Sequence, residues 1–231
     1  MRARFYNPVV GRFTQEDVYR DDGLNLYAYC WNNPVRYYDP SGYGQIKPLN
    51  VNNQKVMDII SKSTNNTNII PTGDEFKKWY DKLSPEDFKT IFSNSDVKKI
   101  VKGRFRAGEV HEWYKVSKVD VYKDWGMKSD EIFSAVTPTE DVRFYKIQTK
   151  NGILDGKHGT ETPSVSGMAH REIDKLIDSS DSKISYSQKL INWADEHFGV
   201  IKDGKLVKGS AGLPEDFHNN VKKEVPKKCK I

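Results

Sequence analysis

Hydrophobic and polar positions divide the chain into two parts of different character. Up to residue 43, short aromatic runs alternate with turn signals such as Asn7-Pro8, Asp22-Gly23 and Asn33-Pro34. This pattern is typical of short strands linked by tight turns. Because a segment of this length cannot bury a core alone, we expect it to complete a larger β structure.

After a polar linker at 44–71 with one short helix, the pattern predicts a mainly helical domain at 72–231. Thr72 precedes Glu75 by three positions, as in a capping box, and Pro85 follows Ser84 at a first helical position. Further predicted elements are helices at 95–101, 129–136, 166–177 and 186–198, a strand at 142–148, a loop at 152–167 and a hairpin at 200–207. The expected fold class is therefore α+β, with a short β-rich segment followed by a mainly helical domain with a few short strands.

Composition excludes several protein classes. The chain is 36% hydrophobic and 30% charged, and it has no apolar run of about 18 residues, so we expect no transmembrane helix. The first ten residues lack the apolar core of a classical signal peptide. The two cysteines, Cys30 and Cys229, are too few for a disulfide framework and lack zinc-finger spacing.

Charge is unevenly distributed. The first 43 residues hold five arginines and five acidic residues, so the whole net charge of +5 and all five histidines fall after them. A basic excess favours polyanionic partners.

Five motifs in the first part occur in a characteristic order. They are Arg4-Phe5-Tyr6-Asn7-Pro8, Gly11-Arg12-Phe13, Leu24-Asn25-Leu26-Tyr27-Ala28-Tyr29, Asn32-Asn33-Pro34 and Asp39-Pro40-Ser41-Gly42. Residues 2–43 thereby resemble the end of the core domain of Rhs (YD-repeat) proteins. The resemblance implies a core remnant whose parent protein encloses a C-terminal toxin in a hollow β cocoon.

The resemblance also implies a self-cleavage motif. Asp17 and Asp39 correspond to the family's pair of aspartates, Arg4 positions them, and the expected cut lies just past Gly42. Two carboxylates that share a proton can activate water against a peptide bond. The chain departs from the family in having Tyr43 where leucine is usual. The alternative is that both aspartates only shape turns.

A second set of motifs lies between residues 104 and 216. It comprises His111-Glu112-Trp113, Trp125-Gly126, Thr137-Pro138-Thr139, His158-Gly159, Ala169-His170-Arg171-Glu172-Ile173, Trp193-Ala194 and Leu213-Pro214. These pieces resemble a toxin family attached to Rhs proteins. That resemblance implies a nuclease, of the HNH or endonuclease VII type, although a complete HNH signature is absent.

A one-metal nuclease needs a histidine base and ligands that hold a divalent ion on the scissile phosphate. Candidate catalytic residues are His111, Glu112, His170, His158 and Glu109, and the three histidines are also the candidate ligands for Mg²⁺, Mn²⁺ or Zn²⁺. His170 is expected near the start of a helix, where a phosphate is favoured. Candidate phosphate-binding residues are Arg104, Arg106 and Arg171.

Two other functions stay open. A metal-independent RNase would use a histidine base, a histidine or glutamate acid, and an arginine or lysine that stabilises the phosphorane charge. A non-enzymatic fragment would only bind a partner. Individually, His111 beside Trp113 is also compatible with a core histidine bonded to the backbone, and Glu109 and Glu112 with solvated carboxylates.

We therefore expect an antibacterial toxin that attacks nucleic acid, with its catalytic part at 102–218. Such a toxin is delivered or secreted by its producer and acts in the target-cell cytoplasm. The producer needs a cognate immunity protein, which we expect to be acidic enough to cover a basic site.

Overall fold

The computed structural model describes most of the second part of the chain and some of the first. The described residues are 4–16, 25, 27–32, 34, 49, 51–106, 108–159 and 163–222. Asp17, Asp39 and the expected cut near Gly42 lie outside them. No helix in the described portion has both the length and the apolarity that a membrane crossing demands.

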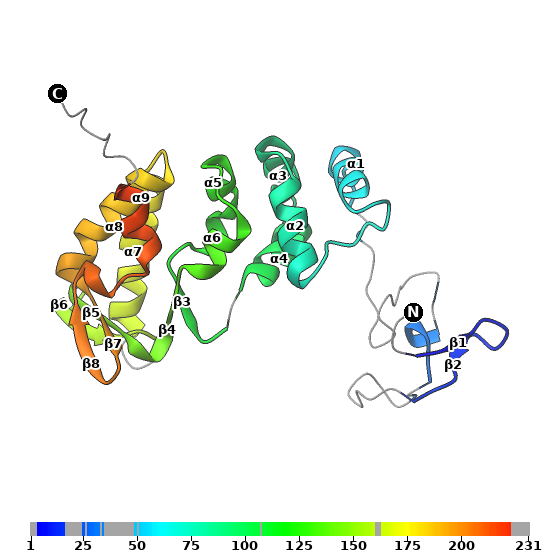
Figure 1. The fold of residues 1–231 in the computed structure, drawn as a ribbon, viewed down its shortest axis with the longest axis horizontal. Coiled ribbons are helices and arrows are strands. Elements are labelled where there is room, and N and C mark those ends of the chain that lie inside the picture. Colours follow the sequence, from blue (N-terminus) through cyan, green and yellow to red (C-terminus); the bar gives the residue numbers. More distant parts are fainter. Residues whose placement is uncertain are drawn as a thin grey trace, which may run out of the picture.

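The helices before residue 135 follow one another along the molecule, and the later helices and strands gather at its far end (Figure 1). The helices are α1 (Gln54–Ser63), α2 (Gly73–Lys82), α3 (Pro85–Phe92), α4 (Ser95–Phe105), α5 (Val119–Asp124), α6 (Ser129–Ser134), α7 (Pro163–Asp178), α8 (Lys183–His197) and α9 (Glu215–Lys222). The strands are β1 (Tyr6–Asn7), β2 (Arg12–Phe13), β3 (Val110–Glu112), β4 (Val136–Pro138), β5 (Val142–Thr149), β6 (Gly152–Lys157), β7 (Phe198–Lys202) and β8 (Lys205–Lys208). The predicted α+β class is confirmed.

The first part contains a small hairpin of β1 and β2. The rings of Tyr6, Phe13 and Tyr29 pack against one another, with the Phe13 and Tyr29 centroids 5.6 Å apart. The Arg4 guanidinium lies over the Phe13 ring at 3.8 Å from its centroid, and Arg4 is buried. Aromatic packing and a cation–π contact thus order these short strands.

The segment predicted as a linker contributes to the core. It contains α1, whose Val56 and Ile60 are buried in the same hydrophobic cluster as α2 to α9. Val51 and Ile70, on either side of α1, are buried in this cluster as well. Residues 51–70 therefore pack as part of the helical domain.

A four-stranded antiparallel sheet in the order β6-β5-β7-β8 carries α7 and α8 (Figure 1). The predicted hairpin is present, and Asp203 and Gly204 both adopt positive φ at its turn. The predicted loop at 152–167 is wrong at both ends, because residues 152–157 form β6 and α7 already begins at Pro163. The exposed and half-buried residues of β6 lack the apolar alternation of a strand, and its hydrogen bonds come from β5.

The earlier start of α7 changes the position of His170. This residue lies in the middle of the helix, seven positions after Pro163, and not near its start. The predicted advantage of a helix N-terminus for phosphate therefore does not apply to His170, since that effect is confined to the first turn.

Ser84 and Thr72 provide a direct test of helix capping. The Ser84 hydroxyl accepts a hydrogen bond from the Asp87 N–H at 3.1 Å, whereas Thr72 makes no such side-chain bond despite its capping-box sequence. Ser84→Ala is expected to lower the free energy of unfolding by about 1 kcal/mol. Thr72→Ala, the matched control, is expected to cost clearly less in urea denaturation. Equal losses in the two variants would contradict this assignment of the caps.

Candidate metal and nucleic-acid site

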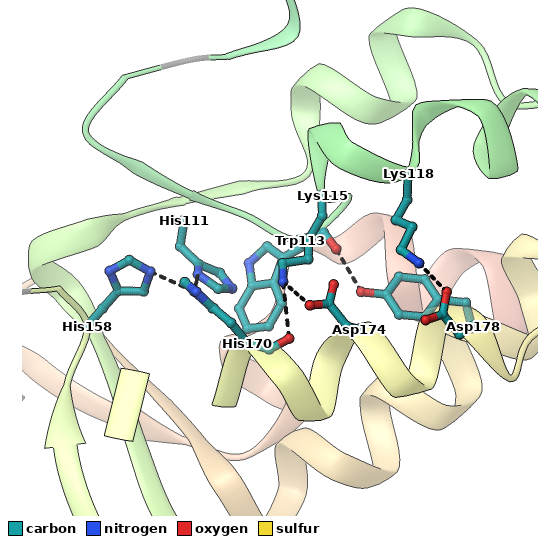
Figure 2. A network of polar contacts seen from close by, with 9 residues as sticks. His111, Trp113, Lys115, Lys118, His158, His170, Asp174 and Asp178 are labelled. Atoms are coloured by element: carbon teal, nitrogen blue, oxygen red, sulfur yellow. Dashed lines mark hydrogen bonds and ion pairs between the residues drawn. The ribbon is translucent and has the colours of Figure 1, made fainter. Parts of the chain in front are cut away.

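Three segments that are distant in sequence bring three histidines together. His111 is the middle residue of β3, His158 directly follows β6, and His170 lies on α7. The Nε2 atoms of His158 and His170 are 3.0 Å apart, and His170 Nε2 is 3.3 Å from His111 Nδ1. Figure 2 shows the three rings converging. No other group of three potential ligands this close is found in the described ranges.

Pairing of β3 with β4 fixes the position of His111. His111 lies opposite Thr137, and the next residue but one, Trp113, donates from its indole Nε1 to the Thr137 hydroxyl at 2.9 Å. The Trp113 ring contacts the His111 ring edge-on, at 4.3 Å between centroids, and Phe144 of β5 packs on the same imidazole. The motifs that contain His111 and Thr137, both part of the toxin resemblance, are therefore neighbours in space.

Lysines connect the segment after β3 to α7. Lys115 Nζ donates to the Asp174 carboxylate at 2.6 Å and to the main-chain oxygen of His170 at 3.1 Å. One turn further along α7, Lys118 pairs with Asp178 at 2.5 Å (Figure 2). The His170–Asp174 spacing of four positions places both groups on one helix face, and Lys115 contacts both. These bonds hold the strand of His111 against the helix of His170.

The surroundings favour the neutral form of the three imidazoles. Burial lowers the pKa of His111 well below its ordinary value, and His170, His158 and Lys115 lower it further. Burial, with added repulsion from His158 and Lys115, lowers the pKa of His170 to about 4, although Asp174 opposes this shift. Burial also lowers the pKa of His158. Near pH 7 the cluster therefore offers lone pairs and not positive charges.

The histidines open into a cavity of about 290 Å³. Its wall includes three cationic side chains and one carboxylate, contributed by Lys102, Arg106, Lys115 and Glu112. Helix α4 extends to Phe105, beyond the predicted end at Val101, and this extension places Lys102 on the last helical turn. A cavity that combines ligand nitrogens with cations is suited to an anionic group beside a metal.

Not all predicted site residues reach this cavity. His111, Glu112, His158, His170 and Arg106 line it, whereas the exposed Glu109 does not. Arg104 is half-buried, and desolvation lowers the pKa of its guanidinium. The exposed Arg171 lines a separate hollow beside Lys150.

Two charged cavity residues were missed by the sequence analysis. Lys102 precedes Arg106 by four positions, so the helical spacing was a usable signal. Lys115 had no local signal, because its partner Asp174 is 59 positions away.

Comparisons of the chain with models of known families, with curated proteins and with solved structures find no match.

Proposed function

We propose that this chain is an antibacterial toxin of the Rhs type whose C-terminal domain is a metal-dependent nuclease. The main support for this proposal is that His111, His158 and His170 converge in a cavity that Lys102 and Arg106 also line. The resemblance of residues 2–43 to an Rhs core end supports the toxin assignment. The resemblance of residues 104–216 supports the nuclease assignment.

The donor set suits a divalent cation. The nitrogens that face one another are 3.0 and 3.3 Å apart, which is close to the spacing of two ligands on one metal ion. A divalent ion held there would polarise a phosphoryl oxygen and acidify a bound water. Lys102 and Arg106 would bind the non-bridging phosphate oxygens and fix the scissile group beside the histidines.

Glu112 is the candidate general base in this arrangement. The three histidines direct nitrogens toward one another, so their lone pairs are used in holding the ion. Glu112 lies on the same cavity wall, and its carboxylate can take the proton from the attacking water. This assigns Glu112 the role that the sequence alone gave to a histidine.

The biological partners follow from the toxin proposal. The cavity's cations call for an immunity protein with an acidic surface, which would block the site and associate quickly. In a full-length parent, the Rhs cocoon would enclose the toxin until delivery. The target-cell cytoplasm supplies the nucleic-acid substrate.

The test incubates the purified full chain with plasmid DNA and with total RNA, in Mg²⁺, Mn²⁺, Zn²⁺ or excess EDTA. Cleavage of either substrate that EDTA abolishes is the expected result. RNA cleavage that survives EDTA would instead support the metal-independent RNase. A folded chain that cleaves neither substrate under any condition would overturn the nuclease proposal and favour a partner-binding role.

A further inference from the structure

The contacts among the three histidines cannot all be good hydrogen bonds. His170 Nε2 faces His158 Nε2 at 3.0 Å and His111 Nδ1 at 3.3 Å. The ring nitrogen of a neutral imidazole carries either one proton or one lone pair. His170 Nε2 can therefore serve one of its two neighbours well and leaves the other poorly satisfied. A cation removes this conflict, because it accepts a lone pair from every ring.

The opposite ring nitrogens leave the tautomers of two rings open. His111 Nε2 and His158 Nδ1 are buried, and neither has a hydrogen-bond partner among the described residues. Outside contacts to these atoms therefore do not set the two tautomers. Packing orients the rings instead, since Trp113 and Phe144 flank His111, and Phe144 also lies against His158 and His170. The nitrogens that face one another are free to be the unprotonated ones.

We infer that His111 Nδ1, His158 Nε2 and His170 Nε2 form a three-histidine site for a transition-metal ion of the Zn²⁺ class, with its remaining coordination position open to the cavity. The inference rests on the proposed function in that it names the metal of the same site. It concerns the ion that the chain binds, whether or not Mg²⁺ can also support cleavage.

The distances match this ion. Zinc–nitrogen bonds of about 2.0–2.1 Å at the tetrahedral angle separate two ligand nitrogens by about 3.3–3.4 Å. The His170–His111 pair is already at 3.3 Å, and the His170–His158 pair at 3.0 Å needs only a small opening. One ligand nitrogen of each ring lies within 4.8 Å of the other two, which keeps all three rings within reach of one ion.

The donor chemistry separates Zn²⁺ from Mg²⁺. Mg²⁺ requires oxygen ligands in octahedral geometry and gives up its water reluctantly, whereas imidazole suits Zn²⁺, Ni²⁺, Cu²⁺ and Fe²⁺. Three protein ligands with one open position are the usual arrangement of a catalytic zinc site. Glu112 and the cations Lys102 and Arg106 line the same cavity as the three histidines.

The test uses the full chain without a polyhistidine tag, stripped with EDTA and then dialysed. Zn²⁺ and Mg²⁺ are titrated separately by calorimetry, and Tm is recorded with each ion. We expect one equivalent of Zn²⁺ to bind and raise Tm, Mg²⁺ at the same concentration to do neither, and Co²⁺ to give a visible absorption band of tetrahedral type. No Zn²⁺ binding by the folded wild type would overturn the inference.

Single alanine variants of the three histidines locate the site. Each is expected to lower Zn²⁺ affinity by at least ~10-fold. Loss of an outer-shell partner alone already costs at least that factor, and a direct ligand should cost no less. His197→Ala and His218→Ala are the matched controls, because these histidines bond to the main-chain oxygens of Tyr145 and Ser210, away from the cluster. Circular dichroism identifies variants that fail to fold. An unchanged affinity in a folded His158→Ala variant would overturn the three-ligand site.

The outcomes for the metal and for the function are separable. Zn²⁺ binding without any cleavage overturns the proposed function and leaves the metal site in place. EDTA-sensitive cleavage with Mg²⁺, in a chain that binds no Zn²⁺, overturns the metal site and leaves the nuclease in place.

Discussion

Replacing His170 by alanine is expected to reduce nucleic-acid cleavage by at least ~100-fold, because even outer-shell partners of a metal site are worth up to that factor. His170 is the central member of the cluster, since its Nε2 faces both other rings. Without the His170 imidazole, His111 and His158 remain as two ligands with no third ring between them. The measurement is the initial rate of cleavage at fixed metal concentration, on the substrate that the wild type cuts.

Two further variants show whether this loss is specific. His197→Ala removes a histidine from the last position of α8, outside the cluster, and is expected to keep the wild-type rate. Glu112→Gln leaves the three imidazoles intact, so it should retain metal binding while cleavage falls. A His170→Ala variant that folds and cleaves at the wild-type rate would exclude the cluster as the active site.

The three histidines were predicted together as candidate ligands, but no pattern in the sequence showed that they meet. Glycine next to His158 and the helical spacing of His170 and Asp174 drew attention to these positions. The spacing between His111 and His170, 59 positions, contains no local pattern that reports on distance. Their meeting depends on the β3–β4 pair and on α7 lying against β5, which are long-range interactions, as well as on the local β5–β6 hairpin.

Elements were predicted well where buried positions repeat with a regular period along the sequence. Residues Val142 to Thr149 of β5 include an alternation of buried and less buried positions, and that strand was anticipated. Strand β6 has no buried residue, so its sequence resembled a loop. The error affected the site directly, because β6 ends next to His158. An edge strand is specified by its partner's backbone and not by its own hydrophobic pattern.

Trp113→Ala is expected to lower the free energy of unfolding by about 3–5 kcal/mol, the usual cost of truncating a fully buried tryptophan. The side chain is 0% exposed. Its ring packs against Phe198 at 4.8 Å and Phe217 at 6.5 Å between centroids, so it joins the sheet to α9. Its removal also leaves the buried Thr137 hydroxyl without the indole donor. Urea denaturation followed by circular dichroism measures the change.

Trp113→Phe is the matched control. It keeps an aromatic ring in the core at position 113 and loses the hydrogen bond to Thr137. The loss in the free energy of unfolding should therefore be well below that of the alanine variant. A Trp113→Ala variant within ~1 kcal/mol of the wild type would contradict the central role of this side chain, since such values are ordinary for less critical sites.

Combining the Trp113 and His170 variants tests whether zinc binding contributes to stability. With a total stability of about 5–15 kcal/mol for an ordinary domain, the loss at Trp113 removes a large fraction of that stability. Saturating Zn²⁺ should recover part of this loss, because an ion bound only by the folded state shifts the equilibrium toward it. That recovery requires the three ligands, so it should disappear when His170→Ala is added to Trp113→Ala. A zinc-dependent rescue that persists in the double variant would place the ion elsewhere in the chain.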